Sequence, residues 1–235
     1  ANSEYNANDP FANRDPRLKA YILVNGDKMG STDGVVNSAA DSKTTDGLNK
    51  ENGKSTKTGY YLRKLLRSDI NLNPNSTTKQ KHLNARIRST EILLDYAEAA
   101  NEAQGPKANV GGANYSAYDV IKAIRERAGI GEFGEDPYLE ECAQSKEKMR
   151  ELIRNERRLE LCFENHRFWD LRRWKANLNE AAKGINITTD EATGAFVYKT
   201  FDAEVRKYDD YMNYGPIPYS EILKYSNLKQ NEGWK

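Results

Sequence analysis

The sequence predicts a mainly α-helical protein with tetratricopeptide-like helical hairpins, long irregular loops and a few short strands. Two observations lead to this class. Apolar residues recur at three- and four-residue spacing in three stretches between residues 83 and 163. The first two stretches are joined by a short Gly-rich connection, which is typical of an antiparallel helix pair, and both carry small Ala residues that permit close packing.

Residues 1–82 are predicted to be loop-rich with short strands. The apolar run at residues 19–25 predicts a strand that ends in an Asn-Gly turn. Residues 60–66 form a second apolar patch, which is expected to be another strand. Residues 26–59 contain almost no large apolar side chain, so we expect a long exposed loop, and loops of this length are usually functional or mobile.

Residues 83–183 are predicted to form the helical part of the chain. The first helix is expected over residues 83–103, where a Gly-Pro pair stops it. The second opens at Ser116, because Ser116 and Asp119 have the spacing of a capping box, and it ends at Gly129.

The third helix is expected to open near Ser145 and to continue past Phe163. At 100° per residue, Glu156 and Glu160 fall within about 20° of the middle of its apolar stripe. Two carboxylates one turn apart on an apolar face therefore need an explanation.

A functional explanation is that Glu156 and Glu160 form the acid pair of a retaining glycosidase, whose carboxyls lie about 5–5.5 Å apart. Those carboxyls act from opposite sides of the sugar, which two side chains on one helix face do not easily do. A buried carboxylate has to be paired. We therefore expect both glutamates to pair with Arg157, Arg167 or arginines of neighbouring helices.

Residues 167–174 mix arginine with aromatic residues, a composition that also suits nucleic-acid stacking or a membrane surface. Arginines stacked on core tryptophans explain it with fewer assumptions. The net charge of +1 argues against a general nucleic-acid partner. The longest apolar run covers residues 20–24, far short of the about 20 residues that span a bilayer.

Residues 184–235 are predicted to form an irregular C-terminal segment. Residues 185–188 and 195–201 are expected to pair as a hairpin around the turn at residues 190–194. A short helix is expected at residues 220–224, after an extended Pro-rich stretch.

Few residues suit metal or covalent chemistry. The chain has two histidines and no zinc-hydrolase or phosphate-loop motif, so we expect no cofactor. The acidic loop at residues 46–53 lacks the spacing of a helix-loop-helix calcium site, and a structural calcium there stays an alternative. Cys162 lies in an apolar helical pattern, so a buried free thiol is expected, with a Cys142–Cys162 disulfide as the alternative.

Residues 155–175 strongly resemble the signature of SusD-like (RagB/SusD) proteins, the surface glycan-binding lipoproteins of polysaccharide-utilisation systems. Four further segments agree in the expected order: residues 13–18, 58–64, 96–102 and the terminal 216–222 with 227–234. The signature side chains are scaffold rather than binding residues in that family. Here they are Glu156, Arg157, Glu160, Arg167, Trp169, Asp170 and Arg173.

The resemblance implies that residues 1–235 are the C-terminal portion of a SusD-like domain about twice this length. The start at Ala1 is then expected to be a mid-chain start. It also implies a lipid anchor outside this chain, attachment to the extracellular face of the outer membrane, and a SusC-like TonB-dependent transporter as partner for nutrient uptake.

Candidate ligand-binding residues rest on side-chain chemistry, because the family has no shared sugar-binding position to carry over. Tyr5 and Phe11 offer rings that stack on a pyranose, and Asn8, Asn37 and Asn49 offer amides for its hydroxyls. The sequence holds 14 Tyr and 23 Asn, which suits carbohydrate contact and also ordinary polar loops.

The leading hypothesis is a non-enzymatic protein that captures oligosaccharide outside the cell and delivers it to the transporter. Alternatives are a peptide or protein-nutrient binder, a structural lid of the transporter, and a glycoside hydrolase using Glu156 and Glu160. The sequence does not name the glycan.

Overall fold

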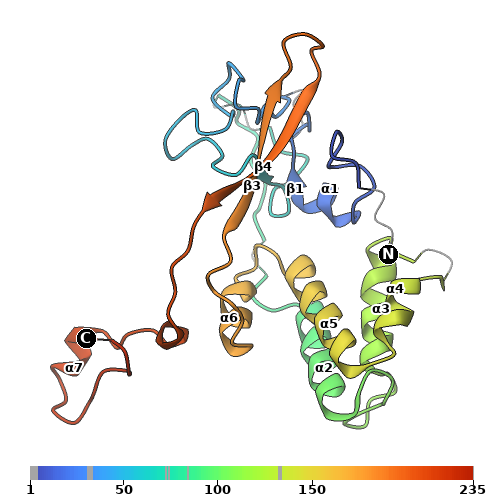
Figure 1. The fold of residues 1–235 in the computed structure, drawn as a ribbon, viewed down its shortest axis with the longest axis vertical. Helices are drawn as coiled ribbons and strands as arrows, with labels where there is room; N and C mark the ends of the chain where they lie inside the picture. The colour runs from blue at the N-terminus through green and yellow to red at the C-terminus, as the bar shows by residue number, and fades with distance from the viewer. Residues whose placement is uncertain are drawn as a thin grey trace.

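The computed structural model describes residues 5–30, 34–71, 73, 75–83, 85–131 and 134–234. A helical body lies at one end, a long β hairpin rises beside the loop-rich N-terminal region, and the C-terminal arm extends away from both (Figure 1). In chain order the elements are α1 Arg17–Tyr21, β1 Ile22–Leu23, β2 Tyr61–Leu62, α2 Ser89–Gln104, α3 Ala117–Arg127, α4 Pro137–Cys142, α5 Lys146–Glu160, α6 His166–Arg173, β3 Ala182–Thr189, β4 Phe196–Glu204, the 3₁₀ helix η2 Asp210–Asn213 and α7 Tyr219–Ile222.

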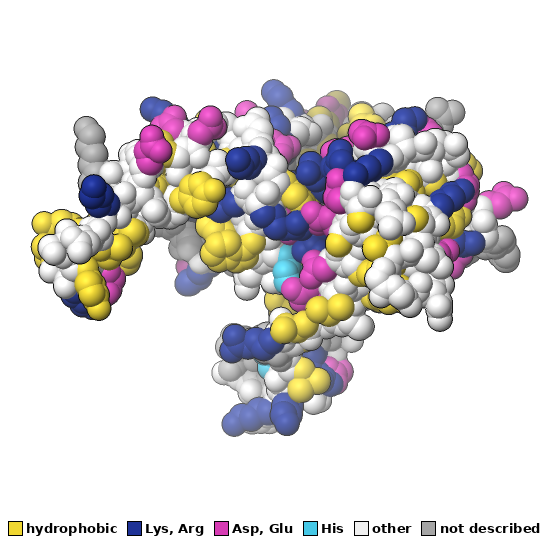
Figure 2. Space-filling view, turned by 90° about the horizontal axis from the view of Figure 1, so that it is seen from below, with side chains coloured by type: hydrophobic (Ala, Val, Ile, Leu, Met, Phe, Trp, Pro, Cys, Tyr) yellow, Lys and Arg dark blue, Asp and Glu magenta, His cyan; other side chains and the backbone are white. Residues whose placement is uncertain are grey.

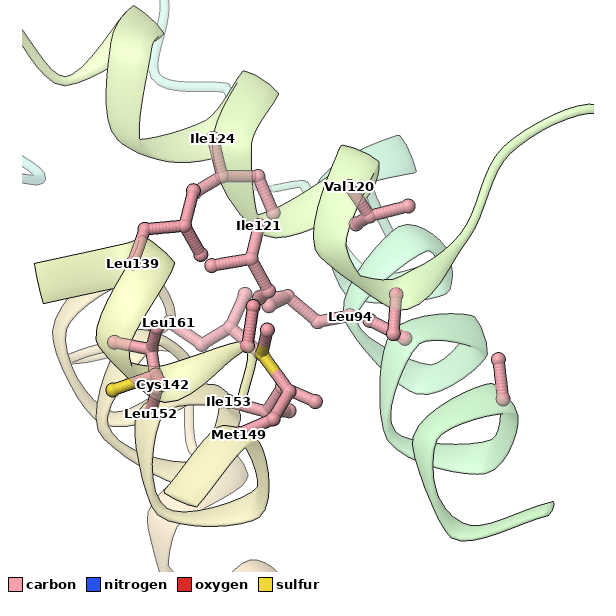
Figure 3. Close-up of a cluster of buried hydrophobic side chains, with 14 residues drawn as sticks. Leu94, Val120, Ile121, Ile124, Leu139, Cys142, Met149, Leu152, Ile153 and Leu161 are labelled. Carbon is pink, nitrogen blue, oxygen red and sulfur yellow. The ribbon is translucent and has the colours of Figure 1, made fainter. Parts of the chain in front are cut away.

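The helical body is held together by one apolar core. Helices α2, α3, α4 and α5 converge on it, with Leu94, Ile121 and Leu152 among its fully buried members (Figure 3). The neighbouring α2 and α3 pack on each other and on α5. The predicted mainly helical fold with a helix pair and few short strands is confirmed.

Two helices begin where their capping residues predict. The Oγ of Ser116 accepts a hydrogen bond from the backbone N–H of Asp119, whose carboxylate accepts one from the backbone N–H of Ser116, so the capping box is complete. The Oγ of Ser145 likewise accepts from the backbone N–H of Lys148 at the start of α5.

The first predicted helix is too long at its beginning. Residue 83 was expected inside it, but α2 begins at Ser89, and Leu83 and Ile87 are 77% and 71% exposed. The reason is Arg88, whose backbone is extended while its guanidinium reaches back to Glu164 at 2.7 Å. A distant ion pair therefore overrides the apolar spacing.

The third predicted helix is split in two. Helix α5 ends at Glu160, and the chain then turns before α6 starts at His166. Phe163 and Asn165 have φ of 64° and 67°, the left-handed region that interrupts a right-handed helix. Arg167 consequently lies on a different helix from Glu156.

Two further predictions need correction. The predicted strand at residues 19–25 is the end of helix α1 followed by the two-residue β1, which pairs with β2. The predicted strand at residues 60–66 shrinks to Tyr61–Leu62. Helix α4 was not predicted, although Asp136 caps it and a proline follows at its first position.

The β hairpin organises the loop-rich half. Strands β3 and β4 pair antiparallel, as predicted, with Thr189 opposite Phe196 next to the turn. A second core forms on this hairpin from Ala39, Ile185 and Ile187, with three aromatic rings packed against it. Residues 26–59 were predicted to be an exposed loop, but part of this segment is buried, including Ser38 and Ala39.

Gly59 marks the closest approach of this loop to the hairpin. Its φ is +81°, and a Cβ there would lie 2.2 Å from the backbone oxygen of Ile185. We expect Gly59→Ala to lower the free energy of unfolding by about 2 kcal/mol, from left-handed strain plus the clash. Gly26→Ala is the control, since Gly26 has φ +90° but nothing within 4 Å of a Cβ. Urea titration measures both, and equal losses would show that the close approach contributes nothing.

The C-terminal arm is closed on itself by side-chain hydrogen bonds. The Gln230 amide bonds both the N–H and the carbonyl of Ile217, at 2.8 and 2.9 Å. Apolar side chains gather on the arm, at the left of Figure 2, where Tyr219, Leu223 and Tyr225 are each about 70% exposed. The short helix predicted at residues 220–224 is α7, displaced by one residue at its start.

Both cysteines are free thiols, Cys142 buried and Cys162 half-buried, so the disulfide alternative is wrong. Burial raises the pKa of each thiol, which favours the protonated form at neutral pH. Within the described residues, no helix combines the length and the apolar character that crossing a bilayer requires.

Candidate functional site

A hollow of about 730 Å³ opens beside the tip of the β hairpin. We call it the hairpin-tip hollow, and its polar and aromatic walls come from the N-terminal segment, the hairpin turn and β4. Its lining includes Asn8, Asp9, Asp190, Thr193, Phe196 and Tyr198.

The turn wall is held in shape by Asp190. Its carboxylate accepts hydrogen bonds from the backbone N–H and the hydroxyl of Thr193, at 2.8 and 2.7 Å. These bonds lower the pKa of the Asp190 carboxyl, so it stays an ionised acceptor. The turn therefore presents a fixed negative oxygen at the edge of the hollow.

The aromatic wall follows from strand periodicity. Phe196 and Tyr198 are two residues apart on β4, so they share one face of the hairpin, with ring centroids 6.5 Å apart. Tyr198 also meets Phe11 edge to face at 5.7 Å. Burial raises the pKa of Tyr198, as does the Asp9 carboxylate, so its hydroxyl is a neutral donor.

Of the five candidate ligand residues, one lines the hollow and four do not. Asn8 lines the hollow, and its side chain forms no hydrogen bond within the described part of the chain. Phe11 does not line the hollow, and its ring packs edge to face against Tyr60 and Tyr198. Tyr5 is 51% exposed and lies under the guanidinium of Arg14 at 4.8 Å.

Asn37 and Asn49 do not line the hollow. The backbone N–H of Asn37 donates to Asp46 at 2.6 Å, and Asn49 occupies a turn with φ of 55°. Both side chains are exposed. Their role in ligand binding stays a prediction.

Sequence reasoning missed the hairpin's own contribution to the hollow. From the sequence alone, Phe196 and Tyr198 are predicted only as strand residues and Asp190 only as a turn residue. The signal was present, because two aromatic residues at a spacing of two beside a polar turn must share one face.

The signature glutamates lie in a buried ion-pair network. Glu156 is 0% exposed and accepts from Arg17 at 2.7 Å and from Arg125 at 2.8 Å. Glu160 is 3% exposed and pairs with Arg88 and Arg127. The prediction that arginines of neighbouring helices pair with the two glutamates is confirmed, because the partners come from α1, α3 and the segment just before α2. The other two expected partners are wrong: Arg157 pairs with Asp95 and Asp170, and Arg167 forms no ion pair with either glutamate within the described residues. Both carboxylates are closed off from any bound sugar.

A second part of the network fixes α6 against α2. Arg157 forms two bonds of 3.1 Å to Asp170, which also binds Arg173 at 2.8 Å. Arg173 continues to Glu98 on α2. Charge-assisted pairs of this kind orient two helices that share little apolar contact.

Trp169 lies on the outer side of α6, whereas Arg167 is half-buried. Trp169 is 66% exposed and meets Phe168 edge to face. Burial lowers the pKa of Arg167, as does the charge of Arg158. The expected stacking of arginine on tryptophan occurs instead at Trp174, where Arg154 and Arg173 lie within 4.9 Å of the ring centroid.

In the part of the chain that the structure describes, no three His, Cys, Asp or Glu side chains come together as metal ligands. The structural calcium at residues 46–53 stays a prediction.

Known proteins match both the sequence and the fold. The sequence profile of the SusD family matches residues 1–234. SusD-like protein P2 of Formosa agariphila is 30% identical over 145 residues, which are 62% of this chain and 24% of that protein.

Two solved structures from Bacteroides fragilis are similar. A SusD-like protein has a TM-score of 0.73 at 27% identity, over 99% of this chain and 43% of its own. A SusD-like carbohydrate binding protein has a TM-score of 0.68 at 24% identity, over 96% of this chain and 43% of its own. The chain thus spans less than half the length of the relatives that it matches. The profile match over nearly every residue shows that this chain belongs to the SusD family.

Proposed function

We propose that this protein binds neutral oligosaccharide in the hairpin-tip hollow, without catalysis. The convergence of Phe196 and Tyr198 with Asn8 and Asp9 carries the proposal. Rings offer apolar faces to sugar C–H groups, while amide and carboxylate oxygens accept from hydroxyls. A relative of the same fold is described as carbohydrate binding, which supports the ligand class.

The proposal extends to nutrient uptake at the cell surface. We infer that the bound oligosaccharide passes to a SusC-like TonB-dependent transporter, and that a lipid anchor outside this chain holds the protein at the outer membrane. Membership of the SusD family supports both steps.

Calorimetry with maltohexaose, cellohexaose, laminarihexaose and xylohexaose tests the ligand class. We expect at least one to bind, and Phe196→Ala and Asn8→Ala to weaken that binding about tenfold, equivalent to about 1.4 kcal/mol. Val205→Ala is the control, because Val205 is 78% exposed and lies outside the hollow.

Two outcomes would contradict the proposal. Heat with a peptide mixture but with none of the four sugars would identify a peptide-nutrient binder. No binding of either class, together with a stable complex with the transporter, would identify a structural lid.

A further inference from the structure

A second cavity, of about 610 Å³, lies where the C-terminal arm leaves the hairpin. We call it the arm-base cavity. One wall is the linker after α6, with Asn177 and Asn179, and the other is the segment after β4, with Tyr208, Asp209 and Tyr214.

The two walls are locked together by Asn179. Its side-chain oxygen accepts from the backbone N–H of Tyr208 at 2.6 Å, and its NH₂ donates to the Tyr208 carbonyl at 2.9 Å. The Tyr208 hydroxyl accepts from Arg172 at 3.1 Å. A cavity whose walls are already bonded loses little conformational entropy when a ligand enters.

The lip of the cavity is also held in place. The backbone carbonyl of Tyr214 accepts from the indole N–H of Trp234 at 2.8 Å, while the Tyr214 ring itself is 68% exposed. Trp234 packs edge to face on Tyr211 at 5.1 Å. An exposed ring on a braced backbone is a ready platform for stacking.

The lining chemistry selects the ligand class. Asp209, Asp210 and the asparagine amides offer acceptors and donors for hydroxyls, beside two tyrosine rings. The lining has two carboxylates but only one lysine, Lys175, so its net negative charge disfavours phosphate, sulfate or uronic acid groups. The cavity suits an uncharged, hydroxyl-rich ligand.

The cavity also has a defined position relative to the hairpin-tip hollow. Asn179 lies just before β3, and Asp190 lies just after it. Eight strand residues separate the two sites by about 26 Å along the hairpin. Each site has a tyrosine and carboxylate or amide groups.

We propose that the arm-base cavity is a second binding site for neutral glycan, so that one long chain engages both ends of the hairpin. This inference rests on the proposed function of the hairpin-tip hollow. Joining two sites through one ligand raises the apparent affinity without a new contact. The protein therefore favours polysaccharide over short oligosaccharide.

The test compares laminarihexaose, maltohexaose, cellohexaose and xylohexaose with laminarin, amylose, hydroxyethylcellulose and xylan. By calorimetry, the wild-type chain binds two molecules of a recognised hexasaccharide. Tyr214→Ala and Asp209→Ala each bind one, as does Phe196→Ala. Each variant loses at least tenfold in affinity for the matching polysaccharide. Tyr225→Ala is the control, an arm tyrosine that is 70% exposed and lies outside the cavity.

The outcomes separate this inference from the proposed function. One hexasaccharide per chain, lost in Phe196→Ala and unchanged in Tyr214→Ala and Asp209→Ala, overturns the second site alone. Binding lost only in Tyr214→Ala and Asp209→Ala overturns the hairpin-tip hollow as the binding site and retains the cavity. No binding of any glycan overturns both. Thermal melting confirms that each variant is folded.

Discussion

Glu156→Gln is expected to lower the free energy of unfolding by about 3 kcal/mol, the range found when one partner of a buried ion pair is removed. The glutamine has nearly the same volume, so the loss comes from charge rather than from a cavity. Arg17 and Arg125 both point at this carboxylate at 2.7–2.8 Å, and both are at least nine-tenths buried. Without it, Arg125 keeps Asp136, and Arg17 keeps Asp15 and a longer contact of 3.4 Å to Glu160.

The matched control is Glu151→Gln on the same helix. The Glu151 side chain is 72% exposed, and its pair with Arg154 at 3.4 Å contributes at most about 0.5 kcal/mol. Urea unfolding, followed by circular dichroism, measures both variants. A loss below 1 kcal/mol for Glu156→Gln would mean that the buried network orients α1 and α3 without stabilising the chain.

The same variant decides the remaining enzymatic alternative. A reducing-end assay on neutral polysaccharides is expected to show no activity in either wild type or Glu156→Gln, because arginines enclose the carboxylate. Activity that disappears in a folded Glu156→Gln variant would overturn the binding function.

Local signals predicted the local features well. The capping box at Ser116 and the N-cap at Ser145 set helix starts correctly, since each is satisfied by neighbours within three residues. The turn at residues 190–194 likewise lies between the two predicted strands, which pair as a hairpin. The apolar stripe of α5 correctly indicated that Glu156 and Glu160 face inward.

The predictions are wrong where contacts between residues far apart in the sequence determine the local structure. Arg88 falls inside the helix predicted at residues 83–103, yet its backbone is extended and its side chain pairs with Glu160 and Glu164. The arginines that pair with Glu156 lie 139 and 31 residues away, and periodicity within one helix carries no information about them. The hairpin-tip hollow was missed for the same reason, because Asn8 and Tyr198 meet only in three dimensions.

Leu94→Ala is expected to lower the free energy of unfolding by about 3 kcal/mol, from lost transfer energy and the cavity left behind. Leu94 is 0% exposed at the centre of the helical body, among side chains from α3, α4 and α5 (Figure 3). Ile92→Ala on the same helix is the control, because Ile92 is 57% exposed and should change stability by less than about 0.5 kcal/mol.

The comparison of the two variants also tests what lies over the outer face of α2. Chemical denaturation of this chain should show a large loss for Leu94→Ala and almost none for Ile92→Ala. The chain spans 43% of a solved relative. Leu94→Ala and Ile92→Ala can therefore also be measured in a protein that contains this chain and has the full length of the relatives. A loss at Ile92 that rises above 1 kcal/mol there would show that further chain covers this face. An unchanged small loss would leave it a solvent-exposed surface, as single apolar side chains often are.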